Sequence, residues 1–295
     1  MGRATTNCPP GDGAGGKDQG MNIDSLRNIL IEEGIEIEEI TIVKNCVQCK
    51  GLRIVRPGQE ASPIVYYSEE ETMSQLAARI RMVAGLDYPP FDPCMLVDPD
   101  FVLTNAYMAI QKKCEDNLAK RTCLNLETYL RVRLSVTTSE SAYFRITGQM
   151  IAQLGLSESD LWNSAEQHFL GSVKIQDIAE VIGIPEDADG SLYVLTAEEP
   201  ACGAAALAIP EIFRGFCEDR GLQSCVILPS STEELLIIPR NLDDLSERFL
   251  NPSELAGMVQ MINAEQVDPV IQLDPVVYVY RIIDDQIVIA AEVTR

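Results

Sequence analysis

Leu192–Pro239 reads LYVLTAEEPACGAAALAIPEIFRGFCEDRGLQSCVILPSSTEELLIIP and has the clearest hydrophobic pattern of the chain. Its short apolar runs, separated by Pro, Gly and polar residues, predict strands, and Pro210 suits the first position of an amphipathic helix. The Ala-rich run before Pro210 could be helix by composition; we expect a strand because proline disfavours the α conformation at the preceding residue. The stretch thus predicts strands at Leu192–Thr196, Gly203–Ile209, Cys225–Leu228 and Leu235–Ile238, and a helix at Pro210–Arg220 that ends at Gly221.

The rest of the chain alternates between strand patterns and amphipathic helix patterns. In Tyr129–Val136 apolar residues alternate with Arg131, Arg133 and Ser135, which predicts a half-buried strand that pairs with Tyr143–Ile146 in a hairpin. Val102–Gln111 fits helix or strand, and strand is favoured. Helices are predicted at Asn22–Glu33, Glu70–Ala84, Glu115–Arg121, Gly148–Leu154, after Ser157, near Ile175–Ile182 and at Asn251–Ala264, and further strands at Glu38–Val43, Leu52–Arg56, Ile64–Tyr67, Val276–Ile282 and Gln286–Ala291.

These patterns predict an α+β fold of antiparallel sheets flanked by amphipathic helices, with a C-terminal ββαββαββ unit from Leu192 onward. Met1–Gly20 is rich in Gly and Pro and almost without apolar residues, so we expect a disordered tail. Pro185–Ser191, PEDADGS, is the clearest linker. We therefore expect one α+β region at 21–184 and another at 191–295, either separate or joined in one compact unit.

Composition and charge limit the classes of function. No apolar run approaches the roughly 20 residues that cross a bilayer, and no basic stretch followed by an apolar core opens the chain, so we expect a cytoplasmic protein without membrane contact. The net charge is −22, and residues 175–295 hold no lysine, six arginines and 22 acidic residues. Phosphate backbones repel such a chain, so direct nucleic-acid binding is not expected. An acidic mimic of nucleic acid is a minor alternative.

The nine cysteines are odd in number and irregularly spaced, which favours reduced thiols in the cytoplasm. Cys46 and Cys49 form a C-x₂-C pair that resembles one knuckle of a zinc ribbon and is a weak candidate metal site. A structural zinc needs two further ligands, which only the fold could supply from Cys94, Cys114 and Cys123. A hairpin turn that happens to hold two cysteines is the favoured interpretation, ahead of zinc and of a redox dithiol.

Catalytic signatures are missing from the sequence. His168 is the only histidine and lies near the end of a predicted helix, where a surface or helix-terminal role is favoured. Ser230 and Ser231 occupy a predicted turn without the G-x-S-x-G motif of hydrolases, and no Walker A or dinucleotide-binding glycine motif follows a strand. Glu233 and Glu234 are adjacent, so they point apart in a strand and are expected on the solvated surface. We predict no catalytic residue, no cofactor-binding residue and no cofactor.

Three segments together resemble a family of uncharacterised bacterial proteins, a domain of unknown function common in gut Firmicutes and often carried on mobile elements. They are Tyr129–Ala165, the opening stretch Leu192–Pro239, and Met258–Tyr280. The C-terminal half also resembles, more weakly, the YtpQ-type family of unknown function. Gly148-Gln149 and Leu161-Trp162 depart from the family pattern, which often has histidine there. The resemblance implies no activity.

We therefore expect a soluble, cytoplasmic, non-enzymatic protein that binds a protein partner, in the biology of a bacterial mobile element. Well-patterned core segments without a convergent polar motif support this expectation. One alternative is an enzyme whose site is assembled from distant Cys or Asp/Glu residues, which predicts a deep pocket that holds a perturbed acid or thiol.

Overall fold

The computed structural model describes residues 22–57, 62–68, 71–85, 93–137, 140–183, 192–198, 202–240 and 251–293, without the side chains of 135–137 and 140–142. The chain divides into two compact units. The first holds the described residues of Met1–Ile42 and Cys49–Phe91, and the second those of Val43–Gln48 and Asp92–Arg295. Residues 43–48, the tip of a hairpin, therefore count with the second unit.

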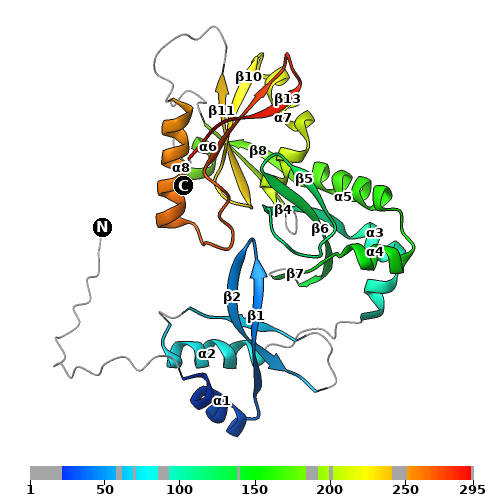
Figure 1. Cartoon of the computed structure of the whole chain (residues 1–295), viewed down its shortest axis with the longest axis vertical. Coiled ribbons are helices and arrows are strands. Elements are labelled where there is room, and N and C mark those ends of the chain that lie inside the picture. The colour runs from blue at the N-terminus through cyan, green and yellow to red at the C-terminus, as the bar shows by residue number, and fades with distance from the viewer. Residues whose placement is uncertain are drawn as a thin grey trace, which may run out of the picture. The chain divides into compact units, whose positions relative to one another are not determined.

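The first unit combines a three-stranded sheet, in the order β1-β2-β3, with two helices (Figure 1). Asn22 and Thr72 cap the helices, because each side chain accepts a hydrogen bond from a backbone N–H of the first turn. The elements are α1 (Ile23–Glu32), β1 (Glu36–Lys44), β2 (Val47–Val55), β3 (Ile64–Tyr66) and α2 (Met73–Ala84). Their apolar faces meet in one core of Leu26, Leu30, Ile37, Leu52, Ile54, Val65, Leu76, Ala77 and Ile80.

The first sheet of the second unit is built around β6 (Leu126–Thr137). This strand pairs antiparallel with β4 (Ala106–Lys112), β5 (Lys120–Cys123) and β7 (Glu140–Arg145). Helix α5 (Glu158–Ser172) packs against β4 and buries Trp162, Ala165 and Phe169. The remaining elements are the 3₁₀ helix η1 (Pro93–Val97), α3 (Pro99–Thr104) and α4 (Gly148–Leu154).

The second sheet of this unit has six strands in the order β13-β12-β10-β11-β9-β8, and each neighbouring pair is antiparallel. Alternate side chains divide between its faces: Val226 and Val277 pack with α8, while Ile227, Tyr278 and Tyr280 belong to the core that includes α7. The elements are β8 (Val173–Asp177), α6 (Ile178–Ile182), β9 (Tyr193–Ala197), η2 (Gly203–Ala208), α7 (Pro210–Asp219), β10 (Ser224–Pro229), β11 (Glu234–Arg240), α8 (Pro252–Gln266), β12 (Val276–Arg281) and β13 (Gln286–Glu292).

The predicted α+β class is confirmed, with antiparallel pairing and helices beside the sheets (Figure 1). Most predicted elements appear within a few residues of their expected bounds. The predictions for the hairpin of β6 and β7, for the helix that Pro210 opens, and for the helix that Asn251 caps are all confirmed. Gly221 follows α7 with φ of +63°, a conformation that suits glycine.

The strand predicted at Gly203–Ile209 is wrong, because the segment forms the buried 3₁₀ helix η2. A Cβ atom on Gly203 would lie 2.3 Å from the carbonyl oxygen of Glu233, so glycine permits this close approach. The Gly203 and Ala204 N–H groups donate to the carbonyls of Glu233 and Thr232 at 3.0 and 3.2 Å. The chain from β9 onward therefore contains a 3₁₀ helix where the predicted ββαββαββ order has its second strand.

Other boundaries also differ from prediction. The predicted helix Glu115–Arg121 is wrong; Lys120 and Arg121 start β5, where pairing with β6 overrides a weak helical pattern. Val102–Gln111 is divided between α3 and β4, and Ile175–Ile182 between β8 and α6.

The second unit joins segments on both sides of the predicted linker. Strands β8 and β9 pair from Val173–Ala197 to Asp177–Tyr193, so the chain on either side of Pro185–Ser191 belongs to one sheet. Described residues on both sides of this segment, from Val102 to Ile287, share one hydrophobic core in the second unit. Pro185–Ser191 and the expected tail Met1–Gly20 lie outside the described residues.

Candidate functional site

The second unit contains a cavity of about 420 Å³, a size typical of small-molecule sites. Both sheets of the unit contribute to it. Strands β4, β6 and β7 supply one side, while the end of β9, the segment before η2 and the turn between β10 and β11 supply another. The polar and charged lining residues are Lys44, Asn45, Gln111, Tyr129, Arg131, Tyr143, Arg145, Thr196, Cys202, Thr232, Glu233 and Glu234.

Arg131 is a buried cation in the wall of this cavity, with 6% of its surface exposed. Its guanidinium carbon lies 4.1 Å from the centre of the Tyr143 ring, a cation–π contact. Its Nε–H has no hydrogen-bond acceptor, and no carboxylate of the described residues forms an ion pair with it. Burial acts to lower the pKa of Arg131, yet the net shift is upward, and a guanidinium stays charged in proteins.

Arg131 and Arg145 lie directly opposite each other in the register of β6 and β7. Both line the cavity, and like charges at opposite positions of an antiparallel pair are destabilising. Arg145 donates only to the carbonyl oxygen of Val43 at 3.3 Å within the described residues. Tyr129, two residues before Arg131, is buried, which raises the pKa of its phenol and keeps it neutral. This wall of the cavity is therefore positively charged.

The opposite charge comes from Glu233, in the turn between β10 and β11, and from Glu234, the first residue of β11. Glu234 accepts a hydrogen bond from the Ser230 hydroxyl at 3.0 Å, and the Ser231 hydroxyl accepts from the Glu233 N–H at 3.0 Å. The serines thus hold the turn, as expected, whereas the structure brings both glutamates to the lining of a cavity. Glu233 is the last residue before β11 and Glu234 is its first, paired with Thr196, so only one of the two lies in the strand.

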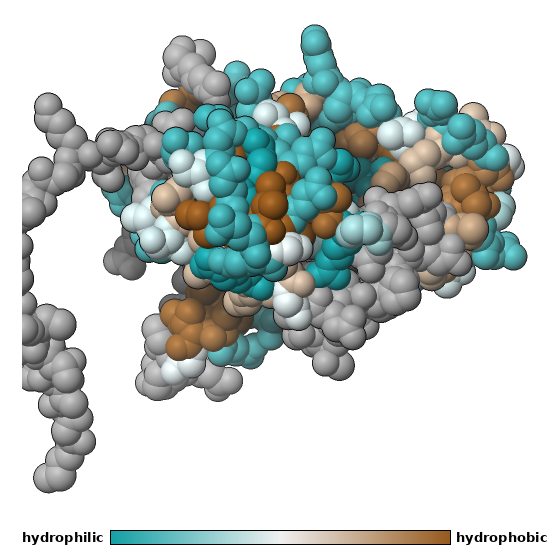
Figure 2. All heavy atoms as spheres, turned by 90° about the horizontal axis from the view of Figure 1, so that it is seen from below, coloured by the Kyte–Doolittle hydropathy of each residue, from teal (hydrophilic) through white to brown (hydrophobic). Residues whose placement is uncertain are grey.

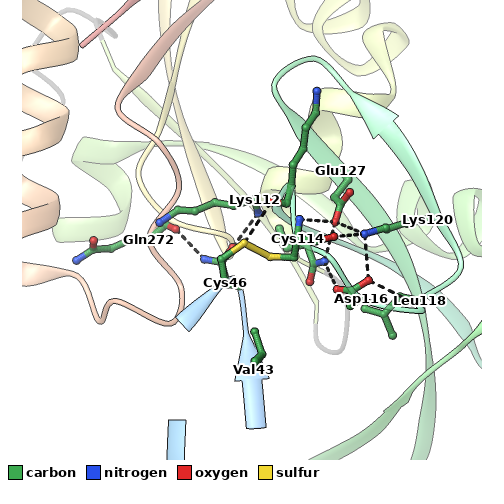
Figure 3. The surroundings of a disulfide bond; sticks show 12 residues. Val43, Cys46, Lys112, Cys114, Asp116, Leu118, Lys120, Glu127 and Gln272 are labelled. Atoms are coloured by element: carbon green, nitrogen blue, oxygen red, sulfur yellow. Dashed lines mark hydrogen bonds and ion pairs between the residues drawn. A yellow bond between two sulfur atoms is a disulfide. The ribbon is translucent and has the colours of Figure 1, made fainter. Parts of the chain in front are cut away.

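The hairpin tip Asn45-Cys46 forms a further part of the site (Figure 3). Both residues have positive φ, 48° and 62°, as two-residue hairpin turns of type I′ require. The Asn45 side chain is buried; its amide donates to the carbonyl of Gln272 at 2.7 Å, and its oxygen accepts from the Lys112 N–H at 2.8 Å. A disulfide joins Cys46 to Cys114, which follows β4. These contacts lie within the second unit, to which residues 43–48 belong, and they position Asn45 in the cavity wall.

Beside the disulfide, Lys120 lies between two carboxylates, at 3.1 Å from Asp116 and 2.9 Å from Glu127 (Figure 3). Burial alone would raise the pKa of Glu127. Hydrogen bonds from the Cys114 N–H, Gln111 and Lys120 lower it by more than burial raises it, so the net shift is downward. The pKa of Asp116 is lowered by the same kind of balance. This network is satisfied internally, which indicates a structural role.

The cysteines correct one expectation. Cys46 and Cys114 are oxidised to a disulfide instead of being thiols, because the hairpin tip brings their Cα atoms to 5.6 Å. Cys46 is thereby committed to Cys114 and not shared with Cys49 in a zinc knuckle. Across the part of the chain that the structure describes, no group of three or more His, Cys, Asp or Glu residues could hold a metal ion.

The only histidine of the chain, His168, does not line the cavity. His168 on α5 is half-buried, its Nδ1 is 2.7 Å from the carbonyl oxygen of Ala106, and its ring lies 5.3 Å from that of Tyr107. It is a helix residue that ties α5 to β4. No described helix is long and apolar enough to span a bilayer.

Residues 111–282 match the model of a family of unknown function, DUF5688, which is more than half of the chain. The chain belongs to DUF5688. The matched segment contains Arg131, Arg145, Cys202, Glu233 and Glu234, but not the hairpin tip. No curated protein and no solved structure matches the chain. The expected ties of this DUF5688 protein to gut Firmicutes, mobile elements and the YtpQ-type family stay predictions.

The alternating pattern predicts a half-buried strand with Arg131 on its exposed face. In the structure the Arg131 side chain is buried. Distant parts of the chain also line the cavity, namely residues 232–234, Cys202 and the hairpin tip. No local sequence pattern predicts that they come together. One signal was present: the predicted hairpin of β6 and β7, closed by a short turn, already places two arginine-bearing strands beside each other.

Proposed function

We propose that this DUF5688 protein is a non-enzymatic binding protein that holds a small anionic molecule in the cavity of its second unit. Arg131 carries the proposal, because it is a buried cation in a cavity wall, opposite Arg145, without a carboxylate partner among the described residues. Burying an ion costs several kcal/mol unless a partner compensates it. A carboxylate or phosphate can accept two parallel hydrogen bonds from a guanidinium, which makes such a ligand the natural compensation.

The net charge of the chain favours small ligands over polyanions. An overall charge of −22 repels an extended anion along its whole length, whereas the cationic cavity acts over a few ångströms. A ligand small enough to enter the cavity meets Arg131 and Arg145 at close range. This reasoning keeps nucleic acid outside the proposed ligands, in line with the expectation from the sequence.

A binding experiment with a matched pair of variants tests the proposal. Succinate and inorganic phosphate are titrated into the intact chain by calorimetry, and into Arg131→Met and Arg133→Met. Arg133 is the control because it lies two residues along β6 and does not line the cavity. We expect at least one of the two anions to bind the wild type, at least tenfold weaker binding to Arg131→Met, and unchanged binding to Arg133→Met.

The stability of the ligand-free variants separates a ligand site from a structural arginine. Because Met fills similar volume without a charge, free Arg131→Met is expected to be as stable as the wild type or more so. A structural arginine would instead lose stability when replaced. Failure of both anions to bind, together with a destabilised Arg131→Met, would overturn the proposal.

We propose the bacterial cytoplasm as its compartment. Cys123, Cys202, Cys217 and Cys225 are buried thiols, which supports a reducing environment, whereas the Cys46–Cys114 disulfide is of a kind that is rare there.

A protein partner is the second candidate, supported by the exposed Met258, Met261 and Ile262 on α8. On the face in Figure 2, hydrophobic residues form separate patches with hydrophilic ones between them. Co-purification at low salt, followed by Met261→Glu, tests this candidate, because a partner held by α8 is lost from that variant. The enzyme and the acidic mimic stay predictions.

A further inference from the structure

The cavity is lined by charges of both signs, with the cations Lys44, Arg131 and Arg145 and the carboxylates of Glu233 and Glu234. Glu233 ends the turn before β11 and Glu234 starts that strand, and backbone hydrogen bonds hold this segment at two points. The Gly203 N–H donates to the Glu233 carbonyl at 3.0 Å, and the Thr232 N–H donates to the carbonyl of Ile271 at 2.8 Å. The backbone of this segment is therefore fixed, and only side-chain rotation can move the carboxylates.

Neither arginine neutralises these acids. Among the described residues, no ion pair joins Arg131 or Arg145 to Glu233 or Glu234, although all four line the same cavity. Glu234 makes its hydrogen bond to the Ser230 hydroxyl instead. A ligand with one negative charge would satisfy the arginines but offer no cation to the carboxylates. A ligand with both charges would satisfy both groups.

The exposure of the charged residues gives the ligand an orientation. Arg131 is 6% exposed, whereas Glu233 is exposed to solvent. The anionic end of a ligand would therefore lie deep, and a cationic end nearer the opening. Since water takes up about 30 Å³ in the liquid, the 420 Å³ cavity has room for roughly fourteen groups of that size. An amino acid or a dipeptide fits this room.

We infer that the ligand is a small zwitterion of the size of an amino acid or dipeptide, with its carboxylate at Arg131 and Arg145 and its ammonium group at Glu233 and Glu234. This inference rests on the proposed function, since it assigns the class of ligand to the same cavity. Loss of the deep contact should weaken binding about thirtyfold or more, because a buried charge is left unpaired. Loss of the contact near solvent should weaken it by about fivefold at most.

Three ligands that differ only at their ends test the inference by calorimetry on the intact chain. L-alanyl-L-alanine carries both charges, its N-acetyl derivative only the carboxylate, and its C-terminal amide only the ammonium group. We expect the order dialanine, N-acetyl-dialanine, dialanine amide from tightest to weakest. The double variant Glu233→Gln/Glu234→Gln should bind dialanine and N-acetyl-dialanine equally, and Glu218→Gln, on α7 and outside the cavity, should behave as the wild type.

The outcomes separate this inference from the proposed function. If N-acetyl-dialanine binds the wild type as tightly as dialanine, the zwitterion is overturned while the anion site stands. If succinate or phosphate binds and neither dialanine nor free alanine does, the zwitterion is also overturned. If dialanine amide binds more tightly than N-acetyl-dialanine, the arginines do not receive the anion and both proposals fail.

Discussion

Removal of the disulfide between Cys46 and Cys114 should destabilise the second unit by an amount that the loop length sets. The bond closes a loop of 68 residues in the unfolded chain. In the chain-entropy account, a loop of this length corresponds to about 4 kcal/mol of stability that the oxidised protein has and the reduced protein lacks. We therefore expect Cys114→Ala to lower the free energy of unfolding of this unit by about 4 kcal/mol.

Replacement of Cys46, the other cysteine of the disulfide, should lower the free energy of unfolding by less. Cys46 has φ of +62°, in the left-handed region that non-glycine residues occupy at a cost of about 1–2 kcal/mol, whereas glycine occupies it readily. Cys46→Gly removes the same disulfide and also relieves this backbone cost. We expect Cys46→Gly to be about 1 kcal/mol more stable than Cys114→Ala, although both lack the bond.

Trp162 makes the measurement specific. It is the only tryptophan, lies on α5 in the second unit, and is 1% exposed, so its fluorescence reports unfolding of that unit. Urea unfolding is followed for the wild type with and without a dithiol reductant, and for both variants. Equal stability of the oxidised and reduced wild type, or of the wild type and Cys114→Ala, would refute the reasoning.

Three further predictions concern packing, pH and thiol reactivity. Gly203→Ala should lower the free energy of unfolding by about 1–3 kcal/mol, because its Cβ would lie 2.3 Å from the Glu233 carbonyl oxygen. Gly215 lies inside α7 with open space around it, and Gly215→Ala should raise the free energy of unfolding by about 0.5–1 kcal/mol in the same urea assay. Since Glu127 has a lowered pKa in the folded protein, its ionised form stabilises the fold; this stabilisation is fully present above its ordinary pKa of 4.5 and is lost as pH falls through the lowered value. In acid unfolding, Lys120→Met should therefore lose less free energy of unfolding over that pH range than the wild type does. Burial raises the pKa of Cys123 to about 11, so mass spectrometry should find it unmodified by iodoacetamide until urea unfolds the chain.

Local pattern predicts most of this fold because most elements have one apolar face. The strand of Tyr129–Val136, the helix after Pro210 and the helix after Asn251 each combine a clear period with a capping or proline signal. The Ala-rich segment after Cys202 lacks such a signal. Alanine is compatible with several conformations, and the conformation is decided by the close approach of Gly203 to the turn at Glu233, which is a tertiary contact.

The candidate site was out of reach for a different reason. Its charged residues are ordinary in their own segments: Arg131 and Arg145 are polar residues of a hairpin, and Glu233 is an acid in a turn. Only the assembled unit shows that Arg131 is covered. The cysteines show the same limit, since a separation of 68 residues between Cys46 and Cys114 contains no sign of pairing.

The net charge of −22 and the arginines of the cavity act on a ligand at different distances. At physiological salt the field of exposed charges decays over about 8 Å, so the acidic surface acts mainly on large or distant partners. Inside the cavity, water screens the buried Arg131 much less, so a ligand that reaches it interacts strongly with that charge. A zwitterion has no net charge to be repelled during approach, yet presents a full carboxylate once it is inside. A small molecule with separated charges can therefore approach the acidic surface without net repulsion and still bind the arginines through its carboxylate.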